Sequence, residues 1–304
     1  MRPDRKPGFF TMLWGLLYPF LLYQGIVTAI SIAVGSLVLA GNFESLAASV
    51  NGSSFYAVLQ NMIYEHYGLI AGVGALCTLP ILIYLYHYDT GKEKRCGMHE
   101  EWENVPFFHF IIVLIMGAAV CLALNHLFIY SRLTELLQDS YEETASLLFQ
   151  GKLILEIAVA GVIIPIVEEL IFRGLAYRRM RWYIKPVPAM ILSALYFGAV
   201  HGNWLQGIYA FIMGMLLAFA YERFHSILAP TLIHIGANTV SVIISETELL
   251  NFVYEDDTAF LIATVIAAAV FVITFYIMVT YVWPRKTAEA SATASNRPDG
   301  IQRR

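Results

Sequence analysis

Charged side chains are scarce in this sequence. Asp, Glu, Lys and Arg make up 14% of its 304 residues, whereas a typical soluble domain contains about 25%. Apolar residues reach 58%, above the roughly 45–50% that is usual for soluble domains. This balance excludes an ordinary soluble domain, a coiled coil and a disordered chain, and it predicts an integral membrane protein.

Positive charge and cysteine are also in short supply. The chain has 19 Lys and Arg against 23 Asp and Glu, so it offers no basic excess to nucleic acid, and we expect no nucleic-acid partner. Its three cysteines, Cys77, Cys96 and Cys121, are odd in number and two of them lie in apolar runs. This pattern argues against a disulfide framework. We also find no internal repeat of the kind that many transporters contain.

Long apolar runs, by contrast, recur along the chain. About 20 apolar residues are needed for a helix to cross the ~30 Å hydrocarbon layer, where every backbone polar group must be bonded internally. The stretches that we assign as membrane-spanning helices are 9–40, 67–87, 107–130, 153–176, 187–201, 204–222, 226–245 and 259–283. The first is overlong and contains Pro19, and the fifth is short. We therefore predict an all-α polytopic integral membrane protein with about eight transmembrane helices.

The distribution of Lys and Arg predicts how these helices are oriented. Positive residues are retained on the cytoplasmic side of a membrane. Sixteen of the 19 basic residues fall in the termini and in alternate loops on one side, while only Arg132 and Lys152 lie on the other side and Arg173 lies inside the fourth span. An even number of spans then places both termini in the cytoplasm.

Three ionisable residues interrupt the fourth span. Glu168, Glu169 and Arg173 follow about 15 apolar residues, and each charge costs about 2.5–3.5 kcal/mol at mid-membrane, so they are candidates for a functional site. Glu169 and Arg173 are four residues apart on one helical face and can form an ion pair, which is also a purely structural interpretation. Glu168 is turned about 100° away and lacks that partner. It is therefore the better candidate for a general base.

Further polar residues lie inside two later spans. Phe197 and His201 are four residues apart in the fifth span, and His234 and Asn238 share that spacing in the seventh. A single histidine inside a membrane helix is compatible with ordinary packing, but two histidines and an asparagine beside a carboxylate pair favour a site. Counting residues at 1.5 Å each puts Glu168 and His234 at similar depths, about 13 and 12 Å, but places His201 at about 21 Å. The assignment of the fifth span does not explain this difference.

The polar residues form three motifs with a known pattern. EELIFR, FGAVH and HIGAN resemble the EExxxR, FxxxH and HxxxN/B motifs of the CAAX-protease and bacteriocin-processing family, which includes the type II CAAX prenyl endopeptidases. The motifs occur in the family's order over residues 168–238, about a quarter of the chain. The site residues that the resemblance implies are Glu168, Glu169, Arg173, His201, His234 and Asn238.

The resemblance implies an intramembrane endopeptidase that hydrolyses a peptide bond in a membrane-associated or lipidated peptide. By this similarity, Glu168 activates a water molecule with the help of His201, and His234 and Asn238 donate hydrogen bonds to the oxyanion. Arg173 orients the carboxylates. Donors aimed at developing negative charge are often worth about 3–4 kcal/mol each, so the assigned roles are chemically reasonable.

The sequence does not decide whether this reaction uses a metal ion. Glu168, His201 and His234 could instead hold a catalytic zinc ion with one position left for water. Against zinc, the chain has no HExxH motif, and the nearest string, HEEWE at 99–103, lacks the second histidine. The cofactor is therefore either none or zinc.

Other chemistries and other functions fit less well. Ser193 lies two helical turns from His201 and cannot form a serine–histidine pair with it inside one helix, and no Asp falls inside any assigned span. An alternative is a non-catalytic membrane binding, chaperone or self-immunity protein that uses the same polar cavity. A proton-coupled transporter is a third reading, and the lack of repeats counts against it.

The organisation that we expect is simple. Residues 1–283 form a single transmembrane domain with its catalytic core at about 153–245, and 284–304 form a disordered cytoplasmic tail. We expect a multi-pass protein of the bacterial cytoplasmic membrane whose active site opens toward the cytoplasm. Membrane lipid and a peptide or lipidated peptide are the expected partners, and the sequence does not determine an oligomeric state.

Overall fold

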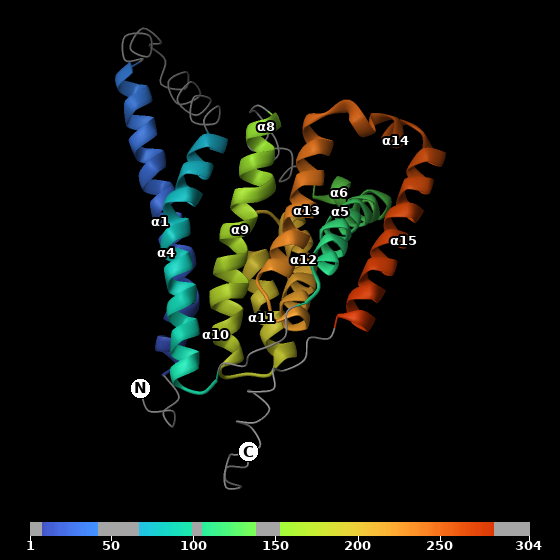
Figure 1. The fold of residues 1–304 in the computed structure, drawn as a ribbon. Coiled ribbons are helices and arrows are strands. Elements are labelled where there is room, and N and C mark those ends of the chain that lie inside the picture. The colour runs from blue at the N-terminus through green and yellow to red at the C-terminus, as the bar shows by residue number, and fades with distance from the viewer. Residues whose placement is uncertain (1–7, 42–66, 99–104, 138–152, 283–304) are drawn as a thin grey trace.

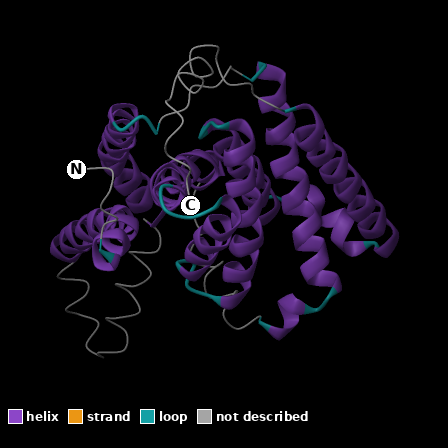
Figure 2. Cartoon of the chain, turned by 90° about the horizontal axis from the view of Figure 1, so that it is seen from below, coloured by secondary structure: helices purple, strands orange, loops and turns teal. Residues whose placement is uncertain are grey.

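The computed structural model describes residues 8–41, 67–98, 105–137 and 153–282. Within these ranges every regular element is a helix and no strand occurs, as Figure 2 shows. The prediction of an all-α polytopic membrane protein is confirmed. The predicted tail at 284–304 lies outside the described residues.

Long helices account for most of the described chain. They are α1 (Phe9–Gly41), α4 (Tyr67–Arg95), α5 (Phe107–Tyr130), α12 (Trp204–Phe224), α13 (Leu228–Glu246) and α15 (Asp257–Tyr281). The shorter helices are α6 (Leu133–Leu136), α11 (Pro186–Ala199), η3 (Glu248–Leu250) and α14 (Asn251–Glu255). These ranges follow the apolar runs of the sequence closely, because an apolar run in lipid satisfies its backbone groups only as a helix.

The segment that carries the EExxxR motif is helical throughout but irregular. It consists of α8 (Leu153–Glu156), the π-helix η1 (Ile157–Ile163), α9 (Ile164–Glu169), the π-helix η2 (Leu170–Tyr177) and α10 (Arg178–Arg181). Pro165 stands at the start of α9, where its missing backbone N–H removes one helical hydrogen bond. Wide π-turns are rare and frequently lie at functional sites. Glu168 and Glu169 are the last two residues of α9, which lies between the two π-helices.

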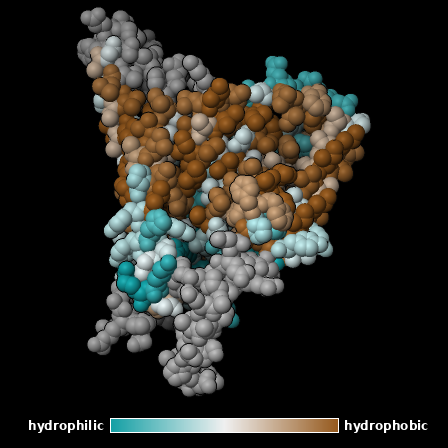
Figure 3. Space-filling view, viewed as in Figure 1, coloured by the Kyte–Doolittle hydropathy of each residue, from teal (hydrophilic) through white to brown (hydrophobic). Residues whose placement is uncertain are grey.

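Six of the described helices are long and apolar enough to cross a membrane. The helix α11 is not among them, because its 14 residues extend about 21 Å at 1.5 Å per residue, less than the ~30 Å layer. The count of eight spans stays a prediction. An apolar band covers the side of the molecule that Figure 3 presents, with hydrophilic residues at its lower margin.

Basic residues gather at one end of the helix bundle. Arg178 binds Glu93 at the end of α4, Arg181 binds Glu222 near the end of α12, and Arg223 donates to the carbonyl of Met278 in α15. We call this region the basic end. The start of α1 and the end of α15 also lie at this end (Figure 1). An even number of spans requires this arrangement, while the side of the membrane on which the basic end lies stays a prediction.

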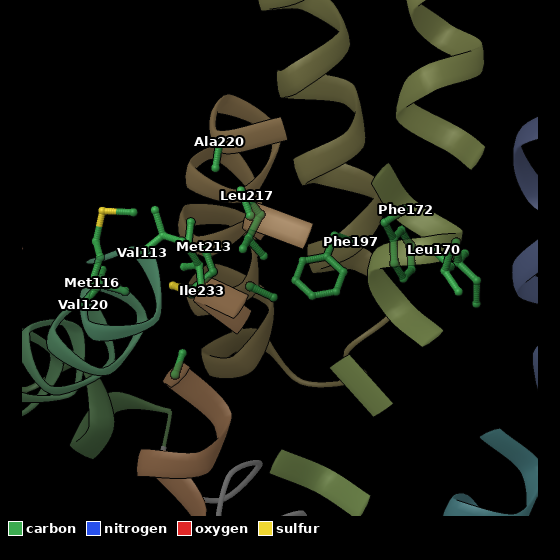
Figure 4. Packing of buried hydrophobic residues seen from close by; sticks show 14 of the residues in the cluster. Val113, Met116, Val120, Leu170, Phe172, Phe197, Met213, Leu217, Ala220 and Ile233 are labelled. Carbon is green, nitrogen blue, oxygen red and sulfur yellow. The ribbon is translucent and has the colours of Figure 1, made fainter. Parts of the chain in front are cut away.

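A close crossing of α5 and α13 fixes the position of the HxxxN motif. A Cβ atom added at Gly117 would lie 1.9 Å from the carbonyl oxygen of Ile233, and one at Gly236 would lie 2.3 Å from that of Leu114. Only glycine allows the two backbones to approach so closely, which is a common device of membrane helix packing. Figure 4 shows Val113, Met116 and Val120 of α5 on the side of Ile233, and the same cluster of buried side chains continues to Phe197 and Phe172.

Candidate active site

Glu169 is the centre of the polar residues inside the bundle. Its Oε1 atom accepts hydrogen bonds from Arg173 Nη1 at 2.8 Å and from His234 Nδ1 at 2.9 Å. The side chains of Glu169 and Arg173 are both fully buried. The predicted i,i+4 ion pair is therefore present, and the carboxylate of this pair also contacts α13.

Arg173 is held from three directions. Besides Glu169, its guanidinium donates from Nη2 to the carbonyl of Gly214 in α12 at 3.3 Å. Its Cζ atom lies 4.4 Å from the centre of the Phe197 ring, within the range of a cation–π interaction. A carboxylate, a backbone carbonyl and the face of an aromatic ring thus stabilise the buried positive charge of Arg173.

Glu168 differs from the neighbouring Glu169 because its side chain is partly exposed. Its side chain is 20% exposed, and its Oε2 atom lies 3.6 Å from His234 Nε2. His234 therefore lies between two carboxylates, with Nδ1 directed at Glu169 and Nε2 at Glu168. Because an ionised carboxylate only accepts hydrogen bonds, the contact with Glu169 places a hydrogen on Nδ1. This contact fixes the orientation of the ring and leaves Nε2 to interact with Glu168.

Phe197 connects the two histidines. Its ring centre lies 4.7 Å from that of His201 and 5.6 Å from that of His234, in edge-to-face geometry in both cases. His201 follows the end of α11, and its Nδ1 lies 2.6 Å from the carbonyl oxygen of Phe197. A neutral ring in this position donates from Nδ1 and keeps Nε2 as an acceptor. The end of α11 thus brings His201 beside the Phe197 ring, which also contacts Arg173 and His234.

Asn238 lies one helical turn beyond His234. Its Nδ2 donates to the carbonyl of Ala160 in η1 at 3.1 Å. The amide therefore ties α13 to the irregular helix that carries the carboxylates. The carbonyl of Ala160 is available because its partner in π-helical pairing is residue 165, a proline without a backbone N–H.

The zinc alternative receives no geometric support. Among the described residues, no group of three or more His, Cys, Asp and Glu side chains is close enough to hold a metal ion. Glu168 and His234 approach each other, but His201 does not complete a ligand set with them. The described residues therefore assign zinc no catalytic step, and the two alternatives for the cofactor, none or zinc, are separated by solution experiments.

Sequence reasoning missed two contacts of the site. It paired Glu169 with Arg173 but not with His234, and it did not identify Gly214, whose carbonyl accepts from Arg173. Gly214 lies in no motif. A Cβ atom there would lie 2.9 Å from the Cα of Ala194 and 3.3 Å from Arg173 Nη2, so only the packed helices show why a glycine is required.

Comparisons with known proteins match the part of the chain that contains this site. Residues 150–240 match the family model described as "Type II CAAX prenyl endopeptidase Rce1-like". The chain is also 31% identical over 108 residues to a Bacillus subtilis (strain 168) protein named "Putative membrane peptidase YdiL". That alignment covers 34% of this chain and 43% of the relative, so the chain matches less than half of the relative's length. No solved structure matches.

Proposed function

We propose that this chain is an intramembrane peptidase of the CAAX-protease family, and the family match over residues 150–240 supports this proposal. The proposed substrate is a membrane-associated or lipidated peptide, and the reaction is hydrolysis of one of its peptide bonds. Membrane lipid surrounds the enzyme. The proposed location is the bacterial cytoplasmic membrane, with the active site open toward the cytoplasm.

One observation carries this proposal: a partly exposed carboxylate stands beside a fully buried one. Glu168 is 20% exposed, whereas Glu169 is fully buried and bonded to Arg173 and His234. A structural ion pair needs only Glu169 and Arg173. The second carboxylate has no structural partner of comparable quality, since its contact with His234 Nε2 is 3.6 Å long. Retaining such a group at membrane depth is costly and points to chemistry.

The proposed reaction begins at Glu168. Its carboxylate accepts a proton from a water molecule, and the resulting hydroxide adds to the carbonyl carbon of the scissile bond. A tetrahedral intermediate forms with a negative oxygen. When this intermediate collapses, the C–N bond breaks and Glu168 returns the proton to the leaving amine nitrogen. Atoms and charge balance without any further reactant.

The remaining residues position and polarise the reactants in this scheme. His201, with Nδ1 bonded to the Phe197 carbonyl, presents Nε2 as an acceptor that orients the water. Asn238 uses one amide hydrogen on Ala160 and has a second for the oxyanion. His234 donates to the oxyanion only when Nε2 carries a proton, because Nδ1 is engaged by Glu169. Glu169 and Arg173 hold His234 in this orientation.

The test is cleavage by purified protein in proteoliposomes, followed by mass spectrometry of the products. The substrates are a prenylated CAAX peptide and a pool of unmodified hydrophobic peptides. We expect Glu168→Gln to lower the rate of cleavage by about 10²–10⁴-fold, the usual contribution of a general base. Glu255→Gln is the matched control, because Glu255 is exposed and lies outside the site. It should cleave at the parental rate.

Stability and metal content are measured on the same samples. Thermal unfolding should show Glu168→Gln within about 0.5 kcal/mol of the parent, as expected for a side chain without a strong partner. A chelator added to the parent reports on zinc. Cleavage by Glu168→Gln at the parental rate would overturn the assignment of the base. If the parent leaves every peptide intact, the non-catalytic binding function replaces the peptidase.

A further inference from the structure

A second polar site lies at the basic end, away from the carboxylates. A cavity of about 180 Å³ opens there between α1, α4 and the residues that follow α10. Its polar and aromatic lining consists of Thr11, Tyr18, Asp89, Lys92, Arg179, Trp182 and Tyr183. The proposed peptidase reaction uses none of these residues.

Among the described residues, the charges that line this cavity leave one positive charge without a carboxylate partner. Arg179 is paired with Asp89, whose Oδ2 lies 2.7 Å from its Nε, and its Nη2 donates to the hydroxyl of Tyr18 at 2.9 Å. Lys92 forms no ion pair with any described residue. Its Nζ atom lies 4.6 Å from the centre of the Trp182 ring, a cation–π contact that leaves the ammonium hydrogens free to bind an anion.

A nearby carboxylate does not neutralise Lys92. Glu93 is the next residue, but its oxygens accept from the guanidinium of Arg178 and from the indole N–H of Trp182. The same bond from Trp182 fixes the indole ring on which Lys92 rests. Lys92 thus brings one positive charge to this cavity, beside an indole ring whose orientation is fixed by Glu93.

The position of the cavity indicates which class of molecule supplies a negative charge to Lys92. Its lining comes from the start of α1, the end of α4 and α10 with the residues after it, which lie at the basic end (Figure 1), and Figure 3 shows hydrophilic residues at the lower margin of the apolar band. Tyr18, Trp182 and Tyr183 line the cavity, and tyrosine and tryptophan are enriched at the level of lipid headgroups. An anionic phospholipid such as phosphatidylglycerol carries one net negative charge, on its phosphate, at this depth, whereas the choline cation offsets that charge in phosphatidylcholine.

We propose that this cavity binds the phosphate group of an anionic phospholipid. Lys92 supplies the charge, and the hydroxyl of Tyr183 supplies a hydrogen bond. The bound headgroup contacts α1, α4 and the residues after α10 together. It therefore secures the end of the helical segment that carries Glu168. This inference is independent of the peptidase proposal, because lipid binding is measured without cleavage.

The experiment is native mass spectrometry of the full chain in detergent after addition of phosphatidylglycerol or phosphatidylcholine. We expect the parent to retain phosphatidylglycerol in preference to phosphatidylcholine. Lys92→Gln should weaken retention of phosphatidylglycerol by about fivefold, since one Lys near an anionic lipid contributes about 1 kcal/mol. Lys94→Gln removes the same charge from the same turn of α4 at an exposed position and should bind as the parent does.

A second variant tests the cavity without changing its charge. Gly15 lines the cavity, and a Cβ atom added there meets nothing within 4 Å. Gly15→Leu should therefore fold normally, fill the cavity and weaken retention of phosphatidylglycerol as Lys92→Gln does.

Three results would overturn the proposal. They are equal retention of the two lipids by the parent, equal losses in Lys92→Gln and Lys94→Gln, and unchanged binding in Gly15→Leu. A further arm adds inorganic phosphate to the parent. Displacement of the lipid by millimolar phosphate would identify the free ion rather than the headgroup as the ligand, whereas continued retention supports the lipid.

Discussion

The helical segment 153–181 contributes arginines to two sets of buried ion pairs, and the two sets are built in different ways. The interior set pairs Glu169 with Arg173, and both side chains are completely buried. The set at the basic end pairs Arg178 with Glu93 and Arg179 with Asp89, and these side chains are between 5% and 10% exposed. Both sets place arginine against carboxylate, yet they differ in how fully their polar atoms are bonded.

The pairs at the basic end are richly hydrogen-bonded. Arg178 donates to both oxygens of Glu93 and to the Thr90 hydroxyl, and Arg179 donates from Nε, Nη1 and Nη2. In the interior, Glu169 Oε2 and Arg173 Nε have no hydrogen-bond partner among the described residues. Well-satisfied buried networks rigidify a fold, whereas buried polar atoms without partners call for a functional explanation. The difference identifies the basic end as a structural clamp and the interior as the candidate site.

The largest predicted effect tests the interior pair. Arg173→Met should lower the free energy of unfolding by about 3–5 kcal/mol, because it removes the main partner of a buried carboxylate. Unfolding of the detergent-solubilised protein by denaturant measures this change. Arg95→Met, at an exposed position of α4, is the control and should change stability by less than about 0.5 kcal/mol.

A double variant tests whether Glu169 and Arg173 stabilise each other. Glu169→Gln with Arg173→Met removes both charges, so its loss of stability should be smaller than the sum of the two single losses. Strict additivity of the single variants would show that the pair is not coupled, and the comparison with the basic end would then lose its basis.

An intermediate effect is expected for the clamp. Arg178→Met should cost about 1.5–3 kcal/mol, the range for hydrogen bonds to charged groups, since Glu93 retains the indole N–H of Trp182. The same unfolding experiment measures it, and cleavage by the folded variant should stay near the parental rate. A loss of cleavage as large as that of Glu168→Gln would contradict the structural assignment.

The smallest effect concerns the more exposed pair of Arg181 and Glu222. Their side chains are 31% and 23% exposed, so Arg181→Gln should cost only about 0.2–1 kcal/mol. Added salt should shrink the difference between variant and parent, because solvent-exposed pairs are screened. A loss of stability larger than that of Arg178→Met would contradict the expectation that the more exposed pair contributes less.

Local regularities made much of this protein predictable. The apolar runs predicted the helices, since lipid leaves the backbone no other way to bond its polar groups. The four-residue spacing of Glu169 and Arg173 predicted their ion pair, because residues i and i+4 face each other on a helix. The same reasoning found the spacing of Phe197 with His201 and of His234 with Asn238.

Contacts between segments that are far apart in the chain were harder to predict from the sequence. The sequence predicted a short span at 187–201, and the helix that forms there, Pro186–Ala199, is too short to cross the bilayer. Its depth therefore depends on packing against Arg173 and His234 through Phe197. No periodicity within one helix contains this information.

The sequence by itself determined a helical membrane protein with three motifs, a basic end and a paired Glu169 and Arg173, because each follows from composition or from the geometry of a single helix. The tertiary structure alone decided that His234 bonds Glu169 and faces Glu168 with its other nitrogen. That arrangement depends on how closely α13 approaches its neighbours. The closeness is set by side chains, and by their absence at Gly117 and Gly236, on helices far apart in the chain.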